Sequence, residues 1–230
     1  MNRLHVQGYN GDIDIASAED LWSEGGDYPF PAAAAATTIV SASANDTAAG
    51  TGARTVAVRG LGSDLGELNE TVTLSGATPV TLANSFFRIN QIEVLTAGSG
   101  GINAGALSVK HGATVIGSVE ASMGRSRSAV FTPSTRFPAH RIKSISGAIL
   151  DATAGTANFN LWTRKSGGAW QIRKTISVYG AAGTFVEVPV DIGLAAGEDV
   201  RLRADVTGDN SIVAGGFDIV YGSLSNVANV

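Results

Sequence analysis

The chain has 230 residues, no cysteine and a formal net charge of −4 at pH 7, and only 16% of its residues are charged. The acidic balance argues against a dedicated nucleic-acid-binding protein, which would need a basic surface. The missing cysteines exclude disulfides and thiolate metal sites.

A surface of small neutral side chains, with 29 glycines in the chain, favours burial against other subunits, because desolvating charged groups is costly. A β protein with many short turns would have the same composition. The N-terminus has no apolar signal core, and no stretch is long and apolar enough to span a bilayer. No membrane association is therefore expected.

Residues 1–40 are predicted to form an extended N-terminal arm. Within it, 17–22 has the pattern of a short helix, with Ser17 as N-cap and acids in the first turn. Trp22, Tyr28 and Phe30 lie in a segment too short to bury them by itself. We expect these rings either to pack within the chain or to dock on another subunit.

A first β-sandwich block is predicted over 41–113. Its clearest strand is 54–59, where strict alternation places Val56 and Val58 on one buried face. The run 70–74 can share that face. The strand 86–95 changes its apolar phase, and one bulge at Asn90-Gln91 would restore it. Residues 114–128 are weakly patterned and are expected to form a linker or crossing.

A second β-sandwich domain is predicted over 129–230, with a tight hairpin loop at 165–169. Its strands are expected at 129–132, 141–150, 157–164, 170–178, 185–190, 199–206 and 216–221. In strand 199–206, Val200 and Leu202 are expected inside, and Arg201 and Arg203 outside. The sequence therefore predicts an all-β protein of two tandem antiparallel, jelly-roll-like β-sandwich domains behind the arm.

No catalytic or metal-binding pattern stands out. The three histidines, His5, His111 and His140, have no metal-ligand spacing and are expected to be ordinary surface or edge residues. Three oxygen-rich stretches are expected to be Asx turns and not calcium sites: 10–14, Asp64 with Glu67, and Asp209-Asn210. No cofactor, no metal and no enzymatic activity are expected.

A loose basic group accompanies the crossing into the second block. Its members are Arg125, Arg127, Arg136, Arg141 and Lys143. A solvated edge between the two domains is one interpretation, and contact with an acidic patch on a partner is the other.

Several runs resemble recurring blocks in the virion structural proteins of tailed bacteriophages, and the match covers most of the chain. They include SASANDTAAGTGARTV (41–56), FRIN (87–90), AGSGGINAG (97–105), FNLWTR (159–164) and RLRA (201–204). The family's Pro-x-Gly-Lys turn is replaced here by PSTRFP (133–138), which leaves the shape of that turn open.

The resemblance implies a non-enzymatic building or attachment protein of the virion, assembled in the host cytoplasm. The leading hypothesis is a capsid or neck decoration (cement) protein, a homotrimer that clamps major capsid or neck and tail subunits through its N-terminal region. Trp22, Tyr28, Phe30 and Arg54 are the candidate subunit-interface residues. No nucleic acid, membrane or cofactor is implied.

The alternative hypothesis is a short head or tail fibre that recognises a host surface glycan or protein. Trp162, Trp170 and Tyr179 are then the candidate outward-facing contacts, although roles inside the core are the other interpretation of these rings. A third possibility, a glycan-cleaving enzyme, is favoured by no residue pattern.

Overall fold

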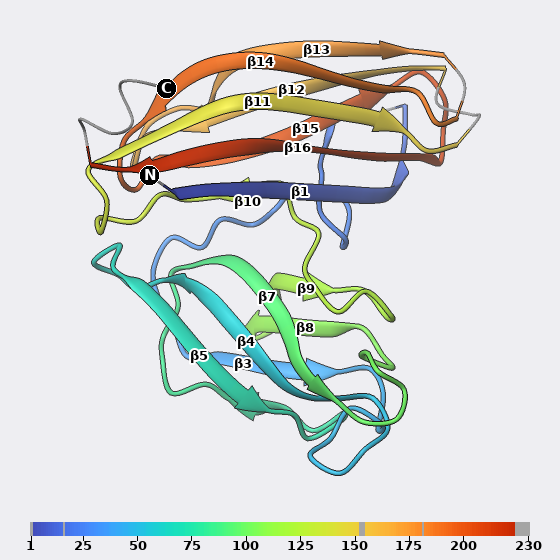
Figure 1. Cartoon of the computed structure of the whole chain (residues 1–230), viewed down its shortest axis with the longest axis vertical. Coiled ribbons are helices and arrows are strands. Elements are labelled where there is room, and N and C mark those ends of the chain that lie inside the picture. Colours follow the sequence, from blue (N-terminus) through green and yellow to red (C-terminus); the bar gives the residue numbers. More distant parts are fainter. Residues whose placement is uncertain (1, 16, 152–154, 181, 224–230) are drawn as a thin grey trace. The chain divides into compact units, whose positions relative to one another are not determined.

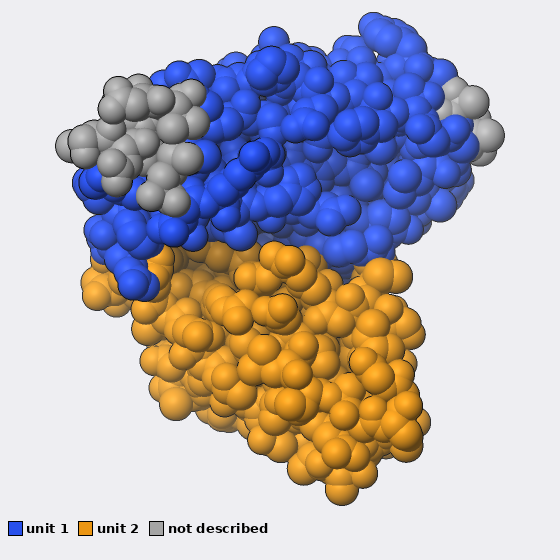
Figure 2. Space-filling model, in the orientation of Figure 1, with its two compact units in different colours: residues 1–28, 127–230 blue, residues 29–126 orange. Residues whose placement is uncertain are grey.

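A computed structural model describes residues 2–15, 17–151, 155–180 and 182–223, and there it contains antiparallel strands and no helix (Figure 1). Among these residues, no helix is long and apolar enough to cross a membrane. The predicted all-β fold class with antiparallel sandwiches is confirmed. The chain divides into two compact units: unit 1 is 1–28 with 127–230, and unit 2 is Pro29–Ser126 (Figure 2).

Unit 1 consists of two sheets. Sheet A has the strand order β1 (Asn2–Ile13), β16 (Ser211–Gly222), β11 (Ala139–Ile149), β14 (Phe185–Leu194). Sheet B has the order β10 (Val130–Phe131), β15 (Asp199–Val206), β12 (Thr156–Arg164), β13 (Gln171–Tyr179), and the short β2 (Glu19–Asp20) also pairs with β15.

This pairing is a jelly roll. If the eight described strands other than β2 are counted along unit 1, the first pairs with the eighth, the second with the seventh, the third with the sixth and the fourth with the fifth. Such nested pairing, divided between two packed sheets, defines the double-sheet jelly roll. All seven strands predicted for the second domain are present, and residues 224–230 of that prediction lie outside the described residues.

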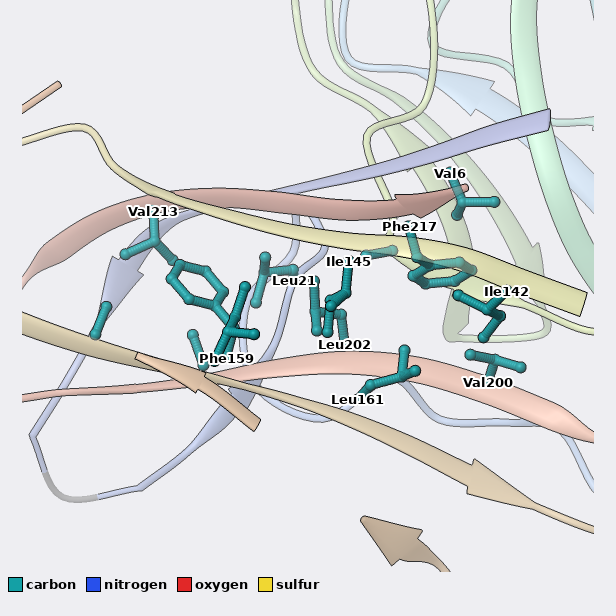
Figure 3. Packing of buried hydrophobic residues seen from close by; sticks show 14 of the residues in the cluster. Val6, Leu21, Ile142, Ile145, Phe159, Leu161, Val200, Leu202, Val213 and Phe217 are labelled. Atoms are coloured by element: carbon teal, nitrogen blue, oxygen red, sulfur yellow. The ribbon is translucent and has the colours of Figure 1, made fainter. Parts of the chain in front are cut away.

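Alternating side chains build the core between the two sheets. In β12, every second residue is buried, and Phe159 and Leu161 reach the centre of the sandwich. Figure 3 shows these side chains facing Ile145 and Phe217 of sheet A, with Leu202 beside them. The period-two pattern of the sequence thus has its physical cause in a sheet with one buried face.

The expected N-terminal arm is wrong for residues 2–13, which form edge strand β1 along β16. Side-chain contacts of Asp218 in β16 also hold β1 in place. The Asp218 carboxylate binds Arg3 and His5 of β1 and accepts a hydrogen bond from Ser144 of β11. The buried face of β1 includes Gly8 and Asn10 beside Val6, so the strand has little apolar alternation to read.

The expected helix at 17–22 is also wrong, because the backbone there pairs with unit 1. Residues Glu19–Asp20 form β2, and the Leu21 amide donates to the Leu202 carbonyl at 2.9 Å. The Leu21 carbonyl accepts from the Ala129 amide at 2.8 Å. Tertiary pairing therefore overrides a short local helix signal.

Unit 2 is a smaller antiparallel sandwich with its own apolar core. Sheet C has the order β6 (Val80–Thr81), β3 (Thr37–Ser41), β8 (Leu107–His111), β9 (Thr114–Val119). Sheet D has the order β5 (Glu67–Thr73), β4 (Ala53–Leu61), β7 (Arg88–Ala97). As predicted, Val56 and Val58 of β4 are fully buried. The predicted bulge is confirmed, since Arg59 pairs with Gln91 and Gly60 with Ile89, which leaves Asn90 unpaired in the ladder.

The domain boundaries differ from the predicted arm, block, linker and block. Unit 2 is inserted between β2 and β10 of unit 1, so the domains are not in tandem. The expected linker begins with β9, whose Ile116 is fully buried. Gly117 interrupts the apolar pattern of β9, and a Cβ there would lie about 3 Å from side-chain atoms of Ile89 and Ile92. Close packing thus favours a small residue at the position that makes the strand hard to recognise.

A second close approach generates a test of the unit 1 core. A Cβ on Gly147 of β11 would lie 2.4 Å from a ring carbon of Phe159, which is fully buried and cannot move aside. We expect Gly147→Ala to lower the free energy of unfolding of unit 1 by roughly 1–3 kcal/mol, the usual cost of overpacking. Urea denaturation measures this change.

The matched control is Gly193→Ala in the same sheet, where the nearest atom to the added Cβ lies 3.8 Å away. That variant should stay within about 0.5 kcal/mol of the wild type. Adding Phe159→Leu should partly rescue Gly147→Ala if the clash is the cause. Strictly additive losses in the double variant would contradict this explanation.

Candidate functional site

The resemblance-bearing runs 41–56 and 97–105 meet at one buried carboxylate in unit 2. Asp46 is fully buried and accepts hydrogen bonds from Ser41 Oγ at 2.6 Å and from the amides of Ala53, Ala104 and Gly105 at 2.7, 2.8 and 2.9 Å. Burial by itself would raise the pKa of Asp46, but these four hydrogen bonds hold the pKa below its ordinary value.

Small residues allow the two runs to approach this closely. A Cβ on Gly52 would lie 2.1 Å from Asp46 Oδ1, and one on Gly98 would lie 2.1 Å from the Gly50 carbonyl oxygen. The small-residue composition of these runs is therefore needed for the loop framework around Asp46. The sequence pattern marked the two runs, but it did not indicate that Asp46 joins them.

The candidate interface aromatics pack within the chain, which is the first of the two alternatives. In unit 1, Trp22 and Tyr28 are buried and meet edge to face at 5.1 Å, and Trp22 Nε1 donates to the Gly25 carbonyl at 2.7 Å. In unit 2, the buried Phe30 ring lies 5.5 Å from the Arg88 guanidinium. Their burial corrects the expectation that these rings are presented to another subunit.

Arg54, the fourth candidate interface residue, is half-buried in β4. Its Nε donates to the Gly50 carbonyl at 3.1 Å. The side chain therefore helps to hold the same small-residue loop.

A buried ionic cluster lies on the outer face of sheet B. Asp20 Oδ2 lies 3.2 Å from Arg201 Nη1, and Asp20 Oδ1 lies 3.8 Å from Arg203 Nε. Arg203 also pairs with Asp27 at 2.7 Å. Burial raises the pKa of Asp20 to about 6, although Arg201, the Tyr28 amide and Arg203 all favour its ionised form. Arg201 thus has the predicted orientation away from the core, but it is buried there instead of solvated.

Two tryptophans of the alternative hypothesis belong to this cluster. The Trp170 ring lies 4.1 Å from the Arg201 guanidinium and 4.5 Å from that of Arg164, and Trp162 lies 5.9 Å from Arg201. Both rings are half-buried, and Trp162 Nε1 is buried without a hydrogen-bond partner among the described residues. Stacking on arginine therefore explains much of their placement.

The same face also has a regular set of polar side chains, which we call the polar ladder; Thr175 is exposed and the other members are half-buried. Its members are Asn158 and Asn160 of β12, Thr175 and Ser177 of β13, and Asp205 of β15. Ser177 and Thr175 donate to the two Asn Oδ1 atoms at 2.6 and 2.7 Å, and the two Asn Nδ2 groups donate to Asp205 at 2.7 and 3.2 Å.

These hydrogen bonds hold the ladder side chains in fixed positions. Each Asn amide still has one N–H and one acceptor lone pair after these bonds, and residues two apart along a strand repeat at about 6.8 Å. Tyr179, with 69% of its surface exposed, pairs with Thr156 beyond one end of the ladder, and Trp162 pairs with Ile172 beyond the other. Of the three predicted outward contacts, Tyr179 is the one that the structure leaves largely exposed.

The remaining sequence candidates are dispersed. Among the residues that the structure describes, no group of three or more His, Cys, Asp or Glu could hold a metal ion. Asn10 and Asp64 form the expected Asx turns with the amides two residues on, at 3.0 and 2.9 Å. Asp209 instead accepts from the distant Ile15 amide at 2.9 Å.

The three histidines occupy different environments. His5 binds Asp218, and burial lowers the pKa of His111. His140 is buried and stacks on Tyr221. The expectation of a surface or edge position is wrong for His140.

The basic group of 125–143 does not act as one patch. Arg127 lies over the Tyr9 ring at 3.8 Å and Arg136 near the Phe137 ring at 5.3 Å. Arg141 and Lys143 both bind Asp191. Four of the five basic side chains therefore contact aromatic rings or a carboxylate within unit 1.

No protein-family model matches the chain, and no curated protein matches its sequence. Among solved structures, an Arthrobacter globiformis isomalto-dextranase complexed with panose is similar at a TM-score of 0.31 and 12% identity, over 93% of this chain and 35% of that chain. This chain thus spans about a third of that protein.

Two structures of infectious bursal disease virus are also similar. The Gx strain gives a TM-score of 0.24 and 9% identity, over 95% of this chain and 71% of that chain. The VP2 subviral particle gives a TM-score of 0.25 and 8% identity, over 96% of this chain and 72% of that chain. At these TM-scores, the similarities support no assignment.

The Asp46 framework leads to a prediction about unit 2. Asp46→Asn replaces one acceptor oxygen by an NH₂ group that faces N–H or O–H donors, so we expect a loss of roughly 3 kcal/mol in the free energy of unfolding. Asp64→Asn, which changes an exposed carboxylate with one amide partner, is the matched control and should have little effect. Equal losses in the two variants, measured by urea denaturation, would contradict the role of Asp46.

The pH dependence of this difference is a further part of the same test. Because the folded-state pKa lies below that of the unfolded chain, the contribution of Asp46 is present above about pH 4 and is lost as the pH falls through the folded-state pKa. The gap between the wild type and Asp46→Asn should therefore shrink below about pH 4.

The buried cluster of unit 1 leads to a prediction about Asp20, whose pKa is shifted in the opposite direction to that of Asp46. Arg201→Met leaves Asp20 buried with weaker compensation, so we expect a loss of about 3 kcal/mol at pH 7. Since the pKa of Asp20 is already raised to about 6, protonation at pH 5 should relieve much of that loss. Thermal unfolding at both pH values measures it, with Arg141→Met, which breaks an exposed ion pair, as control. A loss of equal size at pH 5 and pH 7 would exclude the electrostatic cause.

Proposed function

We propose that this protein is a non-enzymatic structural component of a tailed-bacteriophage particle, a decoration protein of the capsid or neck. The observation that carries the proposal is the place of the resemblance in the structure. Runs 41–56 and 97–105, which resemble phage virion proteins, are the two segments held together by Asp46. The likeness therefore lies in residues that determine the framework of unit 2.

Composition and fold are compatible with this role. A small fraction of charged residues lowers the cost of burying surface against neighbouring subunits. Jelly rolls occur in viral capsid domains and also in lectins, so the fold of unit 1 agrees with the proposal without deciding it. Many copies on one particle would add weak contacts into stable attachment, and we expect the protein to be a homotrimer.

The mode of attachment differs from a clamp by an extended arm. Residues 2–13 are a strand of sheet A and Trp22 and Tyr28 are buried, so deletion of residues 1–40 would remove part of the unit 1 core. Attachment in this proposal uses the surfaces of the folded units.

Particle binding tests the proposal directly. The purified chain, added to particles made without it, should co-sediment with saturation at a fixed number of copies and raise the temperature at which the particles release their genome. Light scattering of the free protein should give the mass of a trimer. No co-sedimentation, or binding that is never saturated, would contradict the decoration role. An unrelated β protein of similar pI serves as control.

A second candidate function, recognition of a host surface glycan or protein, is favoured by the polar ladder. Hydroxyl and amide groups held in a fixed array between Trp162 and Tyr179 suit a polar ligand that also has an apolar face. The wild type should then bind host envelope material, and Asn158→Ala with Asn160→Ala should not. Lys174→Ala, an exposed change on the same sheet outside the ladder, should bind like the wild type. Envelope binding that survives loss of the ladder would contradict this role.

A further inference from the structure

A pocket of about 470 Å³ lies in unit 1, and no member of the polar ladder lines it. Its lining comes from the start of β11, the end of β14, the β12–β13 hairpin and the turn before β15. Four charged side chains line it: Arg141, Lys165, Arg173 and Glu198. Pro138 and Ala195 add exposed apolar surface. This volume lies within the range of small-ligand sites.

The first cation of the pocket is neutralised by a partner. Arg141 binds Asp191 with two contacts of 2.6 Å, and with this guanidinium as the main cause the pKa of Asp191 falls to about 2. This pair therefore adds no net charge to the pocket. The fork geometry occupies Nε and Nη2 of Arg141.

The other two cations, Arg173 and Lys165, have fewer hydrogen-bond and ion-pair contacts. Arg173 Nη1 lies 3.6 Å from Glu198 Oε1, longer than a hydrogen bond, and 3.3 Å from Thr163 Oγ1. Glu198 is buried, and its other oxygen accepts from the Ala195 amide at 3.1 Å. Lys165, at the exposed hairpin loop, has no ion-pair partner in the described part of the chain. The pocket thus has a surplus of one positive charge, with free N–H donors on Arg173 and Lys165.

We propose that this pocket binds a carboxylate-bearing sugar of the uronic acid class. The carboxylate lies between Arg173 and Lys165, and the C–H face of the sugar ring packs on Pro138 and Ala195. A single negative charge matches the surplus of one positive charge. A dianion such as phosphate is less well matched, because the buried Glu198 carboxylate repels the second charge. The proposal goes beyond the virion role and does not depend on it.

Calorimetric titration of the full chain with galacturonate tests the proposal, with galactose as the neutral sugar and inorganic phosphate as the sugar-free anion. Galacturonate should bind at least about tenfold more tightly than either of the other two, a ratio that corresponds to 1.4 kcal/mol. Binding should weaken as salt is added, because the carboxylate is held by charge.

Three variants locate the site. Arg173→Gln and Lys165→Gln should each weaken galacturonate binding about tenfold. Lys165 lies in an exposed loop, so its variant keeps the test valid if Arg173→Gln disturbs Glu198. Lys174→Gln removes the same charge from β13 outside the pocket and should bind like the wild type.

Each other outcome overturns the proposal. Equal affinity for galactose would exclude the role of the carboxylate, and equal affinity for phosphate would leave an anion site without sugar recognition. Absence of binding at millimolar galacturonate, or equal loss in Lys165→Gln and Lys174→Gln, would show that the pocket is not the site. Particle binding can fail while these results hold, so the two proposals are tested separately.

Discussion

Pairing of β1 with β16 is the constraint on which the unit 1 architecture depends. It joins the first strand of the chain to the last strand described, and it supplies one edge of sheet A. Because β1 and β2 come before residue 29 and the other strands of unit 1 follow residue 126, the jelly roll is complete only after unit 2 has been inserted. Such long-range pairing has a high entropic cost of closure. Asp218, which binds both β1 and β11, helps to offset that cost.

Two buried aspartates show how environment decides the role of one residue type. Asp46 is surrounded by four donors and keeps its negative charge with a lowered pKa. Asp20 lies beside two arginines, which favour its ionised form. Burial disfavours that form more strongly, so the pKa of Asp20 rises to about 6. The first aspartate organises loops of unit 2, and the second fastens the segment before unit 2 onto sheet B. Both are structural elements of the fold.

The two ligand-binding proposals rest on surfaces that remain after these structural roles are assigned. Trp162 and Trp170 are partly used by Arg201, and Trp22 and Tyr28 are buried, so single aromatic residues are poor guides to binding in this protein. The polar ladder and the basic pocket are different, because neighbouring strands bring their polar groups together while leaving donors free. Both surfaces are proposed here as binding sites.

The sequence by itself determined the fold class, most strand positions and the bulge at Asn90, because a half-buried strand must repeat its apolar residues with a period of two. It also marked the glycine-rich runs of unit 2. It did not identify β1 or β9, since their buried faces include Gly8, Asn10 and Gly117, which carry no apolar signal. It also missed β2, which is only two residues long. Only the tertiary structure decided the insertion of unit 2, the register that aligns the polar ladder and the meeting of Lys165, Arg173 and Glu198. These features arise from pairing between residues far apart in the chain, and local patterns do not encode such pairing.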